Sequence, residues 1–289
     1  MMIPVFRSKV KEHEIMDGIK ALGLEGACVC LHSSLRSFRA NVADGPHTII
    51  RSFRQSNCTL MVPTFSFAYL VPPPSGMNYR QNGRYSHCPP VTPRPEGFSR
   101  DSVYLDRQQM GAIPAAVLQE KDRLRGNHPL CSFSAIGPYA GDLIHPQAPL
   151  DVYAPFARLC ELDGFVLLMG VELDRCTIIH YAEKLAGINL MRRWARLADG
   201  SIVETENGSC SSGFNRLFSV LEPACRTHRV RGSLWLCFRA KEIVQLATVA
   251  IRANRLIRHC GYSRCVNCND ITAGGPILNA MVPFQSSKR

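Results

Sequence analysis

The stretch VLLMGV at 166–171 and the following segment TIIHYAE at 177–183 decide the fold class. The first is a short, uninterrupted apolar run, which is typical of a strand buried on both faces. The second predicts a helix, and positions three apart on a helix are neighbours. His180 and Glu183 are therefore expected to share one cleft, where the carboxylate orients the imidazole and stabilises its charged form. This arrangement indicates a general base, although solvated or capping His-x-x-Glu pairs are also common.

Strand and helix patterns alternate on both sides of this strand. Strands are predicted at 27–31, 59–62 and 165–171. Helices are predicted at 11–22, 47–55, 110–120, 138–143, 155–162, 177–186, 213–225 and 241–257. The alternation indicates an α/β protein with a mainly parallel central sheet and helices on its faces. With 289 residues, 46% of them hydrophobic, and no internal repeat, we expect one domain spanning 1–289.

Two parts of the chain depart from this alternation. The segment 70–100 is rich in proline and glycine, which excludes regular structure over most of it. It is expected to be a long surface loop, either a functional lid or a disordered insertion. The second part is a C-terminal subregion, 191–289. It begins with a predicted hairpin around Asp199-Gly200 and ends in a tail from His259 without periodicity.

Composition limits the classes of partner. The net charge of +11 and pI of about 9.2 favour polyanionic ligands, such as a phosphate-rich cofactor. A basic nucleic-acid-binding protein is the rival class, and it is disfavoured because the arginines form no dense patches with interleaved aromatic residues. No apolar run is long enough for a membrane span and no signal peptide is recognisable, so a cytoplasmic protein with reduced cysteines is expected.

Five motifs together resemble the aminoglycoside 3-N-acetyltransferase family. They are HSSL at 32–35, VPTF at 62–65, MGAIP at 110–114, HP at 128–129 with SFSAIG at 132–137, and LLMGV at 167–171 through Thr177 to HYAE at 180–183. Their order and spacing match as well as their residues. The resemblance is strong over 20–190 and looser beyond.

The resemblance implies transfer of an acetyl group from acetyl-CoA to a small amine, in a three-layer α/β/α sandwich. It places the general base on His180 and the supporting carboxylate on Glu183. It also implies a set of cofactor contacts. Ser33, Ser34 and Leu35 fall on the pyrophosphate side of acetyl-CoA, and Ser132, Phe133 and Ala135 fall near the pantetheine.

The chemistry of the residues agrees with this implication. A protonated amine cannot attack a thioester, and an imidazole is suited to removing the proton at neutral pH. His32 belongs to the same cofactor cluster, and Arg36 or Arg39 is expected to meet the CoA phosphates. Backbone N–H groups near Ser33 to Leu35, or near Thr64, are candidates for holding the thioester oxygen. Ser33-Ser34 is otherwise explained as a helix N-cap.

The acceptor is less well defined than the donor. Asp151 and His128 are candidate substrate contacts, each with a structural alternative as a turn aspartate or a loop histidine. The expected acceptor is the 3-amino group of a 2-deoxystreptamine aminoglycoside. A non-aminoglycoside biosynthetic amine is the alternative, because aminoglycosides are polycations and this basic chain has only 23 acidic residues. A homodimer is left open.

The tail carries cysteines with the spacing of a zinc knuckle. Cys260, Cys265 and Cys268 follow the pattern Cys-x4-Cys-x2-Cys. A structural zinc ion needs a fourth ligand, for which Cys210 is the first choice and His259 and Asp270 are alternatives. The alternative to a zinc site is a set of reduced loop cysteines.

Overall fold

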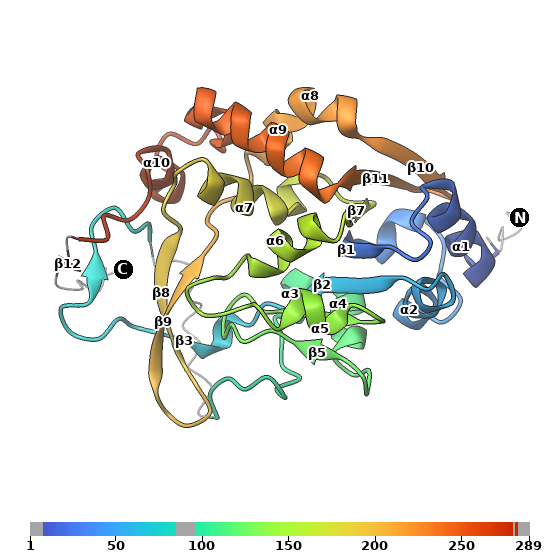
Figure 1. The fold of residues 1–289 in the computed structure, drawn as a ribbon, viewed down its shortest axis with the longest axis horizontal. Helices are drawn as coiled ribbons and strands as arrows, with labels where there is room; N and C mark the ends of the chain where they lie inside the picture. Colours follow the sequence, from blue (N-terminus) through green and yellow to red (C-terminus); the bar gives the residue numbers. More distant parts are fainter. Residues whose placement is uncertain (1–7, 85–95, 280, 283–289) are drawn as a thin grey trace, which may run out of the picture.

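The computed structural model describes residues 8–84, 96–279 and 281–282 (Figure 1). A seven-stranded sheet with the order β10-β11-β7-β1-β2-β6-β5 forms its centre. The three central strands, β7 (Phe165–Met169), β1 (Cys28–Ser33) and β2 (Thr59–Pro63), run parallel to each other. The outer strands are β5 (Leu124–Arg125), β6 (Phe133–Ile136), β10 (Arg226–Val230) and β11 (Ser233–Arg239).

The sheet is mixed, and the expectation of a mainly parallel sheet holds only for its centre. All four outer strands pair antiparallel. The reason lies in the connections. A parallel neighbour requires a long crossover, such as the helix between β1 and β2, whereas a tight turn joins only antiparallel strands. Here β10 and β11 form a hairpin that adds to one edge, with Arg229 and Leu234 paired beside its turn.

The central strands are buried on both faces, as the apolar run in 166–171 predicts. Val166 and Leu168 belong to one hydrophobic cluster, which includes residues of α6, α7 and α9. Leu167 and Met169 belong to a second cluster, with residues of α1, α2 and α4. Helices therefore cover both faces of the sheet. Their bounds are α1 (Glu12–Ala21), α2 (Pro46–Gln55), α4 (Ala112–Val117), α5 (Ala140–Ile144), α6 (Ala154–Glu161), α7 (Ile178–Leu185) and α9 (Ala240–Ala253).

Three expected helices are wrong in detail. The helix predicted at 110–120 is divided at Gly111, whose positive φ of 86° ends α3 (Arg107–Met110) before α4 begins. The helix predicted at 213–225 is a series of short turns, η4 (Phe214–Leu217), α8 (Phe218–Leu221) and η5 (Glu222–Ala224). The helix predicted at 241–257 stops where Asn254 is extended, and a separate turn η6 (Arg255–Arg258) follows.

The remaining elements lie in the loops and in the C-terminal subregion. They include the expected hairpin, β8 (Met191–Arg196) and β9 (Ile202–Asn207), and a helix that the tail pattern did not show, α10 (Val266–Thr272). The segment 70–100 contributes β3 (Leu70–Val71) to this hairpin, and β4 (Asn78–Tyr79) pairs with β12 (Met281–Val282). Three short turns complete the set: η1 (Leu35–Phe38), η2 (Phe67–Tyr69) and η3 (Leu173–Arg175). Among the described residues, no helix combines the length and apolar character needed to cross a membrane.

Candidate functional site

A cavity of about 1080 Å³ opens where the central parallel strands end. Its lining includes residues 31–36 from the end of β1, Pro63 and Phe65 from the end of β2, and Val171 and Thr177 after β7. Ligands in open α/β sheets collect at this edge, where the strand ends leave room and successive loops diverge. The cavity is thus where the sequence predicts the active site.

His180 and Glu183 meet in this cavity as the helix spacing predicts. His180 is 6% exposed and lines the cavity, while Glu183 is fully buried behind it. His180 Nδ1 lies 2.6 Å from Glu183 Oε2. Among the described residues Nε2 has no hydrogen-bond partner, so it is the ring nitrogen left to act on a ligand. A carboxylate on Nδ1 fixes the tautomer and orientation that a general base requires.

Two aromatic rings and one glycine hold the imidazole in place. The Tyr153 ring stacks on it with centroids 6.2 Å apart, and the Phe214 ring meets it edge-on at 4.8 Å. The backbone of Gly208 passes over the third side. A Cβ at position 208 would overlap the Tyr153 hydroxyl and would lie 2.5 Å from His180 Cδ2. The imidazole has little room to move, which is the condition for a preorganised base.

A fully buried arginine, which no sequence pattern indicated, supports the His180–Glu183 pair from behind. Arg258, in η6, forms an ion pair through Nε with Glu183 Oε1. Its Nη2 donates a hydrogen bond of 2.5 Å to the carbonyl oxygen of Cys210. Glu183 therefore lies between the Arg258 guanidinium and the His180 imidazole, with one carboxylate oxygen for each. Position 258 is far from 183 in the sequence, and no short-range spacing could have linked them.

The cluster after β1 lies in the cavity wall. His32, Ser33, Ser34, Leu35 and Arg36 all line it. Burial lowers the pKa of His32 to about 4, so its ring is neutral near pH 7. Ser34 stands at the N-cap position of η1, but its side chain makes no capping hydrogen bond. A role as helix N-cap therefore does not explain the hydroxyl of Ser34.

A second, basic cavity of about 620 Å³ adjoins the first. The two share Leu35 and Arg36. Lys9 and Arg39 also line the second cavity, and none of the described residues in its lining is acidic. The arrangement suits an elongated ligand with an anionic end, because several cations converge on one hollow.

Four expected cofactor contacts are instead part of the core. Thr64, Ser132, Phe133 and Ala135 are all fully buried, and none lines the cavity. The reason is that β6 lies inside the sheet, between β2 and β5, with Phe133 and Ala135 packed in the hydrophobic core. Ser132 Oγ accepts a hydrogen bond of 2.9 Å from Arg125 Nε and donates one of 3.0 Å to the Thr64 carbonyl. These polar groups therefore form hydrogen bonds with one another inside the protein.

The expected backbone donors for a thioester oxygen are mostly engaged. The Ser34 N–H donates to the Met169 carbonyl at 3.0 Å. The Thr64 N–H donates to the Ser132 carbonyl at 2.9 Å. This leaves the N–H of Leu35, the first residue of η1, where intrahelical acceptors are lacking.

The geometry does not support the two expected substrate contacts. His128 is fully buried outside the cavity lining, with Nε2 2.9 Å from the Glu206 carbonyl and Nδ1 accepting from the Cys131 N–H at 2.8 Å. Burial lowers its pKa to about 4, so it serves as a neutral structural histidine. Asp151 also lies outside the lining, and its carboxylate is paired with Lys184 at 3.0 Å.

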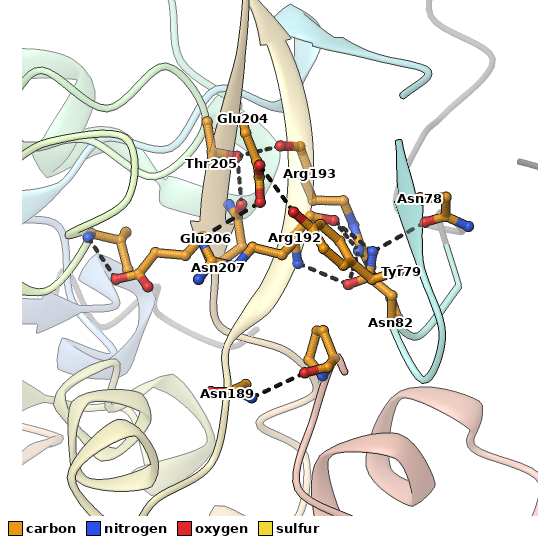
Figure 2. Close-up of polar contacts among 12 residues, drawn as sticks. Asn78, Tyr79, Asn82, Asn189, Arg192, Arg193, Glu204, Thr205, Glu206 and Asn207 are labelled. Atoms are coloured by element: carbon orange, nitrogen blue, oxygen red, sulfur yellow. Dashed lines mark hydrogen bonds and ion pairs between the residues drawn. The ribbon is translucent and has the colours of Figure 1, made fainter. Parts of the chain in front are cut away.

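The β8–β9 hairpin forms a further wall, shown in Figure 2. Arg193 and Asn207 from the two strands line the cavity. Asn82 anchors the preceding segment to this hairpin, accepting from the Arg192 N–H at 2.8 Å and donating to the Arg192 carbonyl at 3.0 Å. The nearby Tyr79 hydroxyl donates to Glu204 at 3.2 Å. The described part of the 70–100 segment is thus fixed to the hairpin, while 85–95 lies outside the described residues.

The segment 107–114, which includes the motif MGAIP, forms another part of the cavity wall. It contributes Arg107 from α3 and the start of α4 to the lining. Arg175, from η3, and its neighbour Asp174 also line the cavity. The described lining residues of the cavity include one carboxylate, Asp174, and four arginines, at 36, 107, 175 and 193.

The four predicted cysteine ligands come together beside this cavity. The Sγ atoms of Cys210, Cys260, Cys265 and Cys268 all lie within 4.8 Å of one another. Hydrogen bonding from the Cys268 thiol lowers the pKa of Cys210, which favours a thiolate there. The alternative ligands are engaged elsewhere, since His259 Nε2 contacts Asn269 at 2.9 Å and Asp270 accepts from the Gly83 N–H at 2.7 Å.

Solved structures share this fold. A crystal structure of the aminoglycoside acetyltransferase AAC(3)-IVa in complex with gentamicin superposes with a TM-score of 0.74 over 93% of this chain and 99% of that chain, at 24% identity. The YokD protein from Bacillus subtilis superposes with a TM-score of 0.71 over 88% of this chain and 97% of that one, at 22% identity.

Sequence comparisons define the family. Aminoglycoside N(3)-acetyltransferase IX of Micromonospora chalcea is 31% identical over 199 residues, which is 65% of each chain and so just under two thirds of that relative. Aminoglycoside N(3)-acetyltransferase IV of a Salmonella species is 29% identical over 71% of this chain and 72% of its own length. The sequence profile of the aminoglycoside 3-N-acetyltransferase family matches residues 30–252. The chain therefore belongs to the aminoglycoside 3-N-acetyltransferase family.

Proposed function

We propose that this protein transfers the acetyl group of acetyl-CoA to a primary amine, with His180 as the general base. The observation that carries the proposal is the imidazole itself. It lines a large cavity, its Nδ1 is held by a buried carboxylate at 2.6 Å, its Nε2 has no hydrogen-bond partner among the described residues, and aromatic rings pack against it. A solvated or capping pair has no need of such support.

In the proposed reaction the amine reacts directly with the thioester. His180 Nε2 takes a proton from the amine, whose nitrogen then forms a bond to the acetyl carbon while the carbon–sulfur bond breaks. CoA leaves as its thiolate, which takes up the second proton that the nitrogen loses as it becomes an amide, and the imidazolium releases the first proton to solvent. Glu183 stabilises the positive charge that His180 gains between these steps. The products are an amide and free CoA, and no acyl-enzyme is required.

The two adjoining cavities suit the shape and charge of acetyl-CoA. The phosphates belong in the basic cavity with Lys9, Arg36 and Arg39. The thioester belongs past the shared residue Leu35, toward His180. Ser33 and Ser34, which precede Leu35 in the lining of the main cavity, would then contact the cofactor there.

The family favours the 3-amino group of an aminoglycoside as the acceptor. A second acceptor class is favoured by the charges on this chain: a non-aminoglycoside amine that also carries an anionic group. Four arginines and one aspartate line the main cavity among the described residues. Arg36 is assigned to the cofactor, and the remaining three still outnumber Asp174, whereas a polycation binds best among carboxylates.

The test is release of free thiol from acetyl-CoA in the presence of a panel of amines. The panel pairs aminoglycosides with amines that bear a phosphate or carboxylate. His180→Ala should lower turnover about 100- to 10,000-fold while leaving CoA binding near the wild-type value. Unchanged turnover in that variant refutes the proposed base, and turnover of aminoglycosides alone refutes the anionic acceptor.

We also propose that the cysteine cluster holds a structural zinc ion. Four thiolates in one tetrahedral set are the usual ligands of such a site, and the Sγ atoms here lie within 4.8 Å of one another. Three come from the tail and Cys210 follows β9, so the ion would fasten the tail to the hairpin. Metal analysis of the purified protein should find one zinc per chain, and Cys265→Ser should lower that content.

A further inference from the structure

Arg258 connects the cysteine cluster to the proposed base. Its guanidinium touches Glu183 on one side and the carbonyl oxygen of Cys210 on the other. It is fully buried, and it packs over the Phe214 ring at 5.8 Å. Phe214 is also the ring that packs edge-on against His180. One side chain therefore contacts the carboxylate, a cluster residue and the packing partner of the base.

The cluster determines where Arg258 lies. Cys260 follows it by two residues, and Cys210 supplies the carbonyl oxygen that accepts its hydrogen bond. The two segments touch again at Gly213, where a Cβ would lie 2.5 Å from the His259 carbonyl oxygen. Both segments that hold Arg258 thus carry a cysteine of the cluster, and anything that fixes the cysteines also fixes the arginine.

A bound zinc ion would fix both segments. Tetrahedral coordination with zinc–sulfur bonds of about 2.3 Å places the sulfur atoms roughly 3.8 Å apart, somewhat closer than the 4.8 Å limit of the cluster. The backbone N–H of Cys260 already points to Cys268 Sγ at 3.5 Å, which helps to stabilise a thiolate. The site thus needs only a small contraction to close on the metal.

We propose that zinc at the cysteine cluster holds Arg258 against Glu183, and that Arg258 is thereby a positioning residue for His180. The inference rests on the proposed role of His180. With one oxygen held by Arg258 and the other by His180, the carboxylate cannot rotate away from the imidazole. A buried carboxylate that loses one cationic partner is poorly compensated and moves or takes up a proton. The rate of acetyl transfer would then depend on whether the cysteine cluster holds zinc, although the metal does not touch the reacting atoms.

The experiment compares four samples: wild-type protein and Arg258→Met, each zinc-loaded and zinc-depleted with a chelator. Thiol release gives kcat and KM, and mass spectrometry gives the zinc content. Zinc-loaded Arg258→Met should keep one zinc per chain and an unchanged KM for acetyl-CoA, but lose about 10- to 100-fold in kcat. Zinc removal should lower the kcat of the wild-type protein by a similar factor. It should change the kcat of Arg258→Met by less than about twofold, because that variant already lacks the guanidinium that contacts both Glu183 and Cys210.

A purely structural metal predicts a different pattern. If zinc removal lowers the kcat of both proteins by the same factor, or unfolds both as seen by circular dichroism, the metal acts on the fold alone and the inference is overturned. A protein that binds no zinc overturns it as well. A third outcome separates the two proposals. If His180→Ala loses turnover but zinc-loaded Arg258→Met keeps the wild-type kcat, Arg258 is not a positioning residue, and the proposed function still stands.

Two matched variants make the comparison specific. Arg255→Met changes an arginine in the same short turn, η6, and should keep the wild-type kcat. Arg258→Lys retains the charge without the planar fork that spans Glu183 and Cys210, so it should recover part of the loss. If Arg258→Met does not fold, Arg258→Lys replaces it in the four-sample comparison, where zinc removal should lower its kcat by a smaller factor than it lowers the wild-type kcat; an equal factor overturns the inference.

Discussion

Gly208→Ala tests how closely the position of the imidazole controls the reaction. A Cβ at position 208 would lie 2.5 Å from His180 Cδ2. Carbon atoms in contact prefer about 3.5 to 4.0 Å, so the ring must move by roughly 1 Å. The substitution causes no backbone strain, because Gly208 has no positive φ. The effect is therefore steric and is directed at the base.

The imidazole cannot absorb this shift without losing a contact. The rings of Tyr153 and Phe214 pack against it, and the new Cβ also overlaps the Tyr153 hydroxyl. Movement by 1 Å away from Glu183 would lengthen the 2.6 Å contact to about 3.6 Å, beyond hydrogen-bond range. A displacement of this size near reacting atoms costs about 100-fold in rate. We expect that loss in kcat and an unchanged KM for acetyl-CoA.

Thiol release under saturating substrate measures the effect, with circular dichroism to confirm the fold. Gly141→Ala is the matched control. Gly141 lies in α5 without a positive φ, and its added Cβ would meet its nearest atom at an ordinary 3.4 Å. It should keep the wild-type rate. A folded Gly208→Ala protein with kcat within threefold of wild type would refute the claim that the position of His180 is rate-determining.

Three further predictions follow from charges in the site and the core. Glu183→Gln should lower kcat and also reduce the free energy of unfolding by about 3 to 5 kcal/mol in urea titrations, because Arg258 is left buried without its carboxylate; equal stability would contradict the ion pair. Burial lowers the pKa of both His32 and His128 to about 4, so protons bind the unfolded chain first as the pH falls from about 6.5 to 4. Each histidine should then cost up to about 3 kcal/mol of stability by pH 4, seen as a falling Tm that His128→Gln makes less steep; a Tm independent of pH over this range would exclude both. Arg175→Glu should raise the KM for an anionic amine about tenfold and lower it for a polycationic one, and the opposite result would favour aminoglycosides.

The sequence predicts the pairing of His180 with Glu183 well because its signals are local. His180 and Glu183 are three residues apart on one helix, and the geometry of that helix alone brings them together. The apolar run before them identifies a strand buried on both faces, and β7 is such a strand. The cysteine spacing Cys-x4-Cys-x2-Cys is local too, and the cluster forms as expected, including the more distant Cys210.

The errors arise where a side chain's environment depends on pairing between distant strands. Ser132, Phe133 and Ala135 follow a family motif, but their burial depends on the position of β6 between β2 and β5, which the motif does not specify. His128 has the same pattern of residues whether it meets a ligand or the Glu206 carbonyl. Arg258 could not be assigned at all, since its role depends on packing across the two subregions.

The location of this support suggests how the reaction can vary within the same core. The proposed base and its carboxylate both lie on α7, yet groups that hold them come from later segments: Gly208 and Phe214 beside the ring, and Arg258 behind the carboxylate. A change in the C-terminal subregion can therefore alter the position of His180 without any change in 165–183. Because second partners of this kind typically contribute about 10- to 100-fold in activity, such changes are large enough to adjust turnover and too small to abolish it. Relatives with the same helix motif are for this reason expected to differ in kcat according to what stands at the positions of Arg258 and Gly208.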